Sequence, residues 1–256
     1  MKAIIIGAGI GNRISEIAKK TPKALIEING ITIAERQISL FKKNGISDIV
    51  IITGPYNDKF NLKNVIYVYD SNYSEHDILG SLMEARSHIK DDVLIIYSDI
   101  LFDKKILSKV LRLKCDIGIA VDLNWEDAYN RRLNHPKSEA ENVLLDSNGK
   151  IIQIKKNIQS LDGVIGEFLG LMKLSPHGSE VFVKKYVSLQ KNQKGEFHDA
   201  SSLSKAYLTD MIQELINSQI NVTPIIVSGK WCEIDTKQDL DRAKTLFLWE
   251  FIKNLY

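Results

Sequence analysis

Short continuous runs of apolar residues alternate along the first half of the chain with segments in which apolar residues recur at helical spacing. A short continuous apolar run is typical of a strand that is buried on both faces. Strands that alternate with helices indicate right-handed crossovers and a mainly parallel sheet covered by helices, which is an α/β fold. The predicted strands lie at residues 3–6, 49–53, 65–69, 93–97 and 117–121, and the predicted helices at 33–43, 79–89 and 104–113.

The pattern changes after about residue 122, where strands are expected to pair in a hairpin. Asn148 and Gly149 separate two strand-like segments at 142–146 and 150–155, as the turn of a β-hairpin does. No linker or internal repeat is visible, so we expect residues 1–256 to form one domain, with about 123–205 as an inserted portion. Further elements are expected as a strand at 166–174, a helix at 176–186, a polar loop at 187–204, a helix at 207–217, a strand at 222–227 and a helix from 237.

The composition is that of a globular protein with a sizeable core, since 44% of the 256 residues are hydrophobic and 26% are charged. A net charge of +2 argues against binding to nucleic acid or to a membrane surface. No apolar run is long enough to cross a bilayer, and the chain opens on a strand where a signal peptide would stand. Cys115 and Cys232 lack metal-type spacing and are expected to be free thiols. We therefore expect a cytoplasmic protein.

The first predicted strand ends in glycines at alternate positions, Gly7, Gly9 and Gly11, followed by Arg13 and later by Lys23. Glycine leaves no Cβ to keep a ligand away, and a loop after a strand can point successive N–H groups at an anion. Arginine grips phosphate oxygens bidentately, and lysine adds a point-like cation. The segment predicts a site for nucleotide phosphates, although glycines after a strand can also form only a tight turn.

Two aspartates stand where a metal ion could be held. Asp99 follows the predicted strand at 93–97, at the carboxyl end where ligands bind in parallel sheets. Asp235 precedes Thr236 and the last predicted helix. Mg²⁺ favours one or two carboxylates together with phosphate oxygens and waters, so the pair is a candidate magnesium site. Either aspartate could instead serve as a helix N-cap.

Familiar nucleotide-binding motifs do not account for the glycine loop. Asn12 stands where G-x-G-x-x-G would need glycine, and no P-loop sequence occurs. The G-x-G-x-R loop, the later Pro22-Lys23, Asp99 and the segment W-C-E-I-D-T at 231–236 together resemble the nucleotidyltransferases that build nucleoside-diphosphate-linked small molecules.

This resemblance implies a Rossmann-like, mostly parallel sheet flanked by helices, the nucleotide-diphospho-sugar transferase fold. It also implies that Arg13 and Lys23 are catalytic and that Asp99 and Asp235 bind Mg²⁺. The implied nucleotide-binding residues are Gly7, Ala8, Gly9, Gly11, Asn12, Arg13, Lys23, Gly54, Ser81 and Asp99.

Within that family the sequence is similar to the cytidylyltransferases. The stretch Asp77 to Leu82 stands where hexose-1-phosphate enzymes have G-T-A, and it resembles the N-x-x-S-[LM] stretch that places Ser81 near cytosine. Residues 120–143 and 166–175 resemble enzymes that activate 2-aminoethylphosphonate or 2-hydroxyethylphosphonate. The resemblance implies transfer of CMP from CTP to a small phosphonate with release of pyrophosphate. Choline-phosphate cytidylyltransferase, a sugar-1-phosphate enzyme and a non-catalytic nucleotide-binding subunit stay as alternatives.

The inserted portion carries residues that could bind such an acceptor. Arginine and lysine would grip the phosphonate, carboxylates would accept hydrogen bonds from a primary ammonium, and aromatic faces would suit a quaternary one. The alternatives are a solvated basic face, ordinary surface charges and a tryptophan in the core. Apolar residues near the C-terminus could pack within the chain or form a homodimer. The acceptor-binding candidates are Arg131, Arg132, Lys155, Glu139, Glu141, Glu167 and Trp231.

Overall fold

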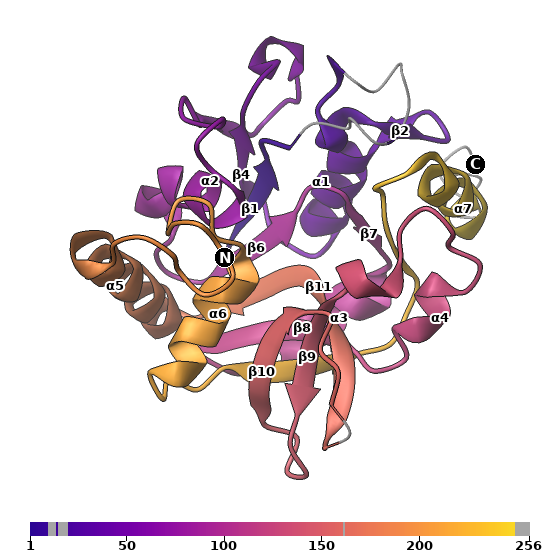
Figure 1. The fold of residues 1–256 in the computed structure, drawn as a ribbon. Coiled ribbons are helices and arrows are strands. Elements are labelled where there is room, and N and C mark those ends of the chain that lie inside the picture. Colours follow the sequence, from indigo (N-terminus) through magenta and orange to yellow (C-terminus); the bar gives the residue numbers. More distant parts are fainter. Residues whose placement is uncertain (10–13, 15–19, 161, 249–256) are drawn as a thin grey trace.

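The buried isoleucines, valines and leucines of the predicted strands form one nine-stranded sheet (Figure 1). The structure is a computed structural model, and it describes residues 1–9, 14, 20–160 and 162–248. The strands of this sheet are β1 (Lys2–Gly7), β4 (Asp48–Thr53), β5 (Ile66–Tyr69), β6 (Val93–Tyr97), β8 (Ile117–Asp122), β9 (Glu141–Leu145), β10 (Ile151–Lys156), β11 (Val164–Leu174) and β12 (Thr223–Val227).

The sheet is mixed and mostly parallel in the half that comes first in the chain. Strands β5, β4, β1 and β6 run side by side in parallel, and β8 and β12 form a second parallel pair. The long strand β11 lies antiparallel between β6 and β8, and its first residues also pair with β9 of the β9–β10 hairpin. Because β11 reverses direction between them, β6 and β8 point the same way, so the carboxyl ends of β1, β4, β6 and β8 share one edge.

Helices cover both faces of the sheet. Helix α6 contacts both α2 and α5 on one face, on the left in Figure 1, and α1 and α3 lie on the other side. Helix α1 begins in a capping box between Thr32 and Glu35, which satisfies two free N–H groups of its first turn. The helices are α1 (Ile33–Lys43), α2 (Ile78–Glu84), α3 (Lys104–Arg112), α4 (Glu126–Tyr129), α5 (Pro176–Asn192), α6 (Leu208–Asn217) and α7 (Lys237–Leu246).

Short elements that the hydrophobic pattern did not predict tie the end of the chain to its beginning. Strand β7 (Ile100–Phe102) pairs with β13 (Trp231–Glu233), and β2 (Glu27–Ile28) pairs with β3 (Ile31–Thr32). A second hydrophobic cluster joins these pairs to α7. Its buried members include Ile26, Ile28, Ile33, Leu101, Cys232, Ile234, Ala243 and Phe247.

Most predicted elements are confirmed, and two predictions are wrong. The polar loop expected at 187–204 begins later, because α5 continues to Asn192. The helix expected at 79–89 ends as α2 at Glu84 and continues as a 3-10 turn over Arg86–His88. The apolar C-terminal residues do not all face solvent, since Phe247 is 2% exposed inside the second cluster. Residues 249–256 lie outside the described part of the chain.

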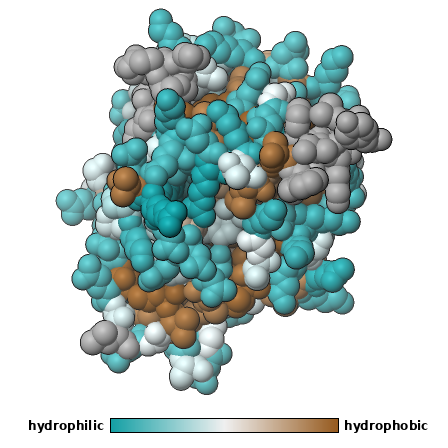
Figure 2. All heavy atoms as spheres, turned by 90° about the vertical axis from the view of Figure 1, so that its right-hand side faces the viewer, coloured by the Kyte–Doolittle hydropathy of each residue, from teal (hydrophilic) through white to brown (hydrophobic). Residues whose placement is uncertain are grey.

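The surface contains no candidate for a membrane span. Within the described residues, no helix is both long and apolar enough to cross a bilayer. The face on the side of α4 and α7 is largely hydrophilic, with hydrophobic residues gathered toward its lower part (Figure 2).

Candidate functional site

A cavity of about 440 Å³ opens at the edge where the parallel strands end. Ala8 and Gly9 follow β1, Pro55 follows β4, and Ser98 and Asp99 follow β6, and all five line it. The loops that follow these three parallel strands therefore lie on one rim of the sheet. This is where α/β sheets bind their ligands.

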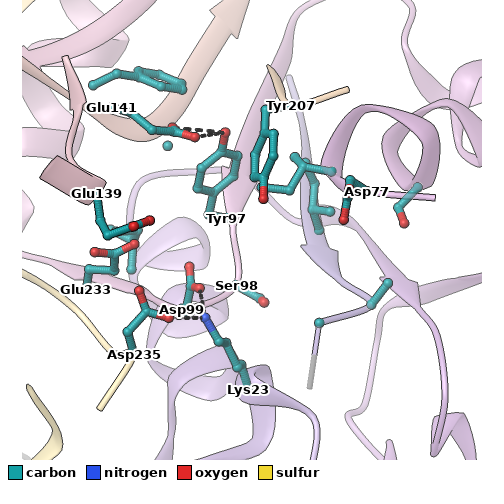
Figure 3. Close-up of a pocket in the computed structure, with 18 of the residues that line it drawn as sticks. Lys23, Asp77, Tyr97, Ser98, Asp99, Glu139, Glu141, Tyr207, Glu233 and Asp235 are labelled. Carbon is teal, nitrogen blue, oxygen red and sulfur yellow. Dashed lines mark hydrogen bonds and ion pairs between the residues drawn. The ribbon is translucent and has the colours of Figure 1, made fainter. Parts of the chain in front are cut away.

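One ammonium group sits between two carboxylates in this cavity (Figure 3). The Nζ atom of Lys23 lies 2.7 Å from Oδ2 of Asp99 and 2.5 Å from Oδ1 of Asp235. The side chains of Lys23 and Asp235 are 15% and 4% exposed, so water screens the contact poorly. Lys23 is held there because its N–H donates to the carbonyl of Gly9 across 3.2 Å, at the start of a 3-10 turn.

The pairing of β7 with β13 brings the two aspartates together. Glu233 stands opposite Ile100 in that pair, and the N–H of Ile234 donates to the carbonyl of Asp99 across 2.9 Å. Asp99 precedes β7 and Asp235 follows β13, so their side chains meet although they lie far apart along the chain.

Neither aspartate caps a helix. Asp103 caps α3, where its carboxylate accepts from the N–H groups of Lys105 and Ile106. Thr236 caps α7, in a reciprocal capping box with Asp239. Both carboxylates are therefore available to the cavity.

Charge explains the arrangement around Lys23. Burial by itself lowers the pKa of Lys23, but Asp99 and Asp235 reverse this effect and hold the pKa above its ordinary value. Two carboxylate oxygens that converge on one cation within hydrogen-bond distance are the donor set that Mg²⁺ prefers. The residues present therefore fit a magnesium ion.

Among the described residues, four glutamates also line the cavity and form an acidic wall, from β9, β11, β13 and the turn before β9. Glu141 accepts a hydrogen bond from the hydroxyl of Tyr97 at 3.2 Å, and Glu167 accepts one from Tyr129 at 2.6 Å. Glu139 pairs with Lys156 at 3.0 Å. The fourth carboxylate is that of Glu233.

Burial and mutual repulsion raise the pKa values of this wall. Burial and the neighbouring Glu233 raise the pKa of Glu141 to about 8. Burial and the nearby carboxylates of Asp235 and Asp99 raise the pKa of Glu233 to about 7. Burial also holds the pKa of Glu167 well above its ordinary value. The wall is therefore short of positive charge.

A buried network of charged side chains, which includes residues of the cavity lining, supports this wall. The Nε of Arg132 donates to Asp239 at 2.6 Å, and its Nη2 lies 3.3 Å from Glu233. The guanidinium also stacks on the ring of Tyr129 at 5.0 Å. His135 lies 3.1 Å from Asp235 and 3.6 Å from Glu233. The segment after β8 is thus anchored to β13 and α7.

A bulge in β11 shapes the floor of the cavity. Gly170 has a φ of +61°, and a side chain there would collide with the ring of Tyr97. The register of β11 against β8 shifts between Phe168 and Met172. Glycine is needed at this position because it tolerates positive φ and lets Tyr97 pack against the backbone.

The structure separates the predicted nucleotide-binding residues into groups. Ser81 lines the cavity, and its hydroxyl donates to the buried Asp70 at 2.7 Å. Gly7 and Gly54 do not line it; a Cβ at Gly54 would lie 2.9 Å from the carbonyl of Ala8, so this glycine permits close packing of two loops. Gly11, Asn12 and Arg13 lie outside the described residues, and their phosphate-binding role stays a prediction.

The structure also sorts the predicted acceptor-binding residues. Glu139, Glu141, Glu167 and Trp231 line the cavity. The cations predicted to grip the acceptor do not: Arg131 is exposed on a turn, Arg132 is held in its buried ion pairs, and Lys155 points away from the cavity that its neighbour Lys156 lines. A one-residue step along a strand reverses the face, which explains the difference between the two lysines.

Several lining residues escaped the sequence-based prediction. Tyr97 ends a predicted strand two residues before Asp99, so its place on the rim could have been inferred. Glu233 stands between Trp231 and Asp235 at alternating positions, which is the period of one strand face. His135 and Tyr207 carried no comparable local signal, because loops and tertiary packing bring them to the cavity.

The raised pKa of Glu141 makes stability depend on pH. Between its ordinary pKa of 4.5 and its folded value of about 8, the folded protein keeps a proton that the unfolded chain loses, so stability falls as the pH rises through this window. The charged groups that face it are Glu233, Lys156 and Asp99, with Tyr97. We expect Glu141→Gln to raise the Tm on the order of 5 °C at pH 8 and hardly at all at pH 4.5.

Thermal unfolding of both proteins across this pH range tests the expectation. The glutamine still offers Tyr97 an acceptor oxygen, so the difference reports the charge. Parallel Tm profiles for the two proteins would contradict it.

Comparison with known proteins places this geometry in a family. Residues 3–129 match the family model of the MobA-like NTP transferase domain. The chain is 28% identical to the CTP:phosphoglutamine cytidylyltransferase of Campylobacter jejuni, over 94% of this chain and 98% of that protein. It is 33% identical to the choline-phosphate cytidylyltransferase of Streptococcus pneumoniae, over 40% and 46%. The inositol-1-phosphate CTP transferase of T. maritima superposes with a TM-score of 0.72 at 17% identity, over 96% and 94%.

Proposed function

This chain belongs to the MobA-like NTP transferase family, and we propose that it is a Mg²⁺-dependent cytidylyltransferase. In this proposal it transfers CMP from CTP to a small phosphonate such as 2-aminoethylphosphonate and releases pyrophosphate. Two relatives are cytidylyltransferases, one aligned over 94% of this chain and the other over 40%. This supports CTP as the nucleotide.

The observation that carries the proposal is the meeting of Lys23, Asp99 and Asp235 at the carboxyl end of β6. Joining an acceptor anion to a triphosphate brings two polyanions together, so the reaction depends on cations more than on a protein nucleophile. Two carboxylates for a metal ion and one lysine for a phosphate are the groups that this chemistry requires.

We assign the following roles to residues of this chain in the proposed reaction. The backbone of Ala8 and Gly9 lines the cavity where the triphosphate would lie. Asp99 and Asp235 would hold Mg²⁺, which when bound lowers the repulsion between acceptor and nucleotide. Lys23 would then leave the two aspartates and contact a phosphate oxygen. Arg13 is proposed to assist it on the same phosphates.

No general base is needed in this reaction. An oxygen of the acceptor phosphonate, already ionised at neutral pH, attacks the α-phosphorus of CTP. The bond from the α-phosphorus to the bridging oxygen breaks, and pyrophosphate leaves with that oxygen and its electron pair. In this proposal the glutamates of the acidic wall surround the acceptor. They hold it and take no proton from it.

Phosphocholine is the second candidate acceptor. Aromatic side chains of Tyr97, Phe168, Tyr207 and Trp231 line the same cavity, and aromatic faces bind quaternary ammonium groups. The pneumococcal relative is a choline-phosphate cytidylyltransferase, which supports this candidate as well.

Pyrophosphate release with CTP and Mg²⁺ tests the proposal. The acceptors are 2-aminoethylphosphonate, 2-hydroxyethylphosphonate, phosphocholine, phosphoethanolamine and glucose-1-phosphate, each repeated with UTP and without metal. We expect release with CTP, dependence on metal and a preference for an aminoalkyl acceptor. Release with glucose-1-phosphate alone, or with UTP in place of CTP, would contradict the proposal.

A further inference from the structure

One carboxylate oxygen in the cavity wall is buried without a hydrogen-bond donor. It is Oε2 of Glu167, which has no hydrogen-bond partner among the described residues. The side chain lines the cavity, and the residue is only 4% exposed. A buried acceptor without a donor costs free energy, so the wall suits a ligand that brings N–H groups.

The cavity contains more acidic groups than basic ones. Among the described residues that line it are seven acidic side chains and two lysines. Both lysines already form ion pairs. Lys23 pairs with Asp99 and Asp235, and Lys156 pairs with Glu139. Glu141 and Glu167 each accept a hydrogen bond from a tyrosine hydroxyl, which is a donor that carries no charge.

Three of the aromatic rings that line the cavity already contact another group, which helps to distinguish two kinds of ammonium ligand. The ring of Tyr207 carries Nζ of Lys156 at 5.0 Å, and the rings of Tyr97 and Phe168 pack edge to face at 5.9 Å. A quaternary ammonium needs free aromatic faces and has no N–H to donate. A primary ammonium has three donors for the acceptors left open.

We propose that Glu141 and Glu167 form the site for a primary ammonium group of the acceptor. The substrates are then amino-substituted phosphonates or phosphate monoesters, and each methyl group on the nitrogen lowers their use. This inference rests on the proposed cytidylyltransferase function and selects between its two candidate acceptors.

A series of matched acceptors tests the inference. Phosphoethanolamine, its N-methyl and N,N-dimethyl derivatives and phosphocholine lose one N–H at a time at constant phosphate, and ethyl phosphate lacks the nitrogen. We expect kcat/KM to fall at each step, by at least about 100-fold from phosphoethanolamine to phosphocholine, because a site built on hydrogen bonds rejects analogues that lack them. Equal or better use of phosphocholine would overturn the inference and leave the cytidylyltransferase function standing.

A binding measurement separates the two proposals. Calorimetric titration of the same compounds uses the full chain with Mg²⁺ and a CTP analogue whose α,β-bridging atom is carbon. Tighter binding of phosphoethanolamine without any turnover on CTP would support the ammonium site and contradict the cytidylyltransferase function. Equal affinity of all five compounds would contradict the site.

Variants of the wall add a test on the protein side. Glu167→Gln and Glu141→Gln are each expected to reduce the preference for phosphoethanolamine over ethyl phosphate by about tenfold, as a ratio of kcat/KM values. Glu126→Gln is the matched control, because Glu126 is 65% exposed, pairs with Lys137 and does not line the cavity. If both wall variants fold, by their Tm, and keep the wild-type ratio, the inference is wrong.

Discussion

Replacing Asp99 or Asp235 with asparagine is expected to lower kcat for pyrophosphate release by at least about a thousand-fold. Each variant keeps the shape of the side chain and removes one of the two charges that converge on Lys23. In the proposed reaction these carboxylates hold Mg²⁺, and a thousand-fold loss corresponds to about 4 kcal/mol of transition-state stabilisation. Steady-state kinetics with CTP and the preferred acceptor measure the loss, and Mn²⁺ electron paramagnetic resonance reads metal binding in the CTP complex separately.

Asp103→Asn is the control for this pair. Asp103 lies four residues after Asp99, caps α3 and does not line the cavity. Asparagine caps helices about as well as aspartate, so we expect wild-type turnover and a nearly unchanged Tm. Full turnover of Asp99→Asn in magnesium would show that the metal assignment is wrong.

Lys23→Met is expected to abolish most turnover and to make the protein's stability respond to divalent cations. In the structure the ammonium of Lys23 occupies the place between Asp99 and Asp235. Removing one partner of a buried ion pair typically costs about 3–5 kcal/mol, because the remaining charges are left uncompensated. We expect the Tm of the variant to fall by about 10 °C without metal and to recover when Mg²⁺ or Mn²⁺ is added without nucleotide, since a ligand that binds only the folded state stabilises it.

Wild-type protein under the same conditions is expected to respond weakly, because its own lysine already neutralises the two aspartates. Lys137→Met provides a matched control: Lys137 is 52% exposed and pairs with Glu126 away from the cavity, so its Tm is expected to change little with or without metal. A Lys23→Met protein that is indifferent to both cations would contradict the idea that this lysine and a metal ion compete for one place.

The sequence alone determined the layers of the fold and one edge of the site. Continuous apolar runs such as 93–97 became buried strands, because a strand covered on both faces leaves no polar position. Asp99 could be placed on the ligand-binding edge because the carboxyl ends of parallel strands meet there. Glu139 and Glu141 could be proposed as carboxylates for an ammonium group of the acceptor, and they line the cavity.

The tertiary structure decided which of these residues meet. Lys23 lies 76 residues from Asp99 and 212 from Asp235 along the chain, and β7 and β13, which bring the aspartates together, are too short to show a period. The sequence likewise did not show that Arg132 is buried in ion pairs with Asp239 and Glu233. Hydrophobic periodicity records which face of each element is buried, whereas the meeting of distant side chains depends on how the elements pack. The acidic wall, with Oε2 of Glu167 buried without a hydrogen-bond partner among the described residues, is a consequence of that packing.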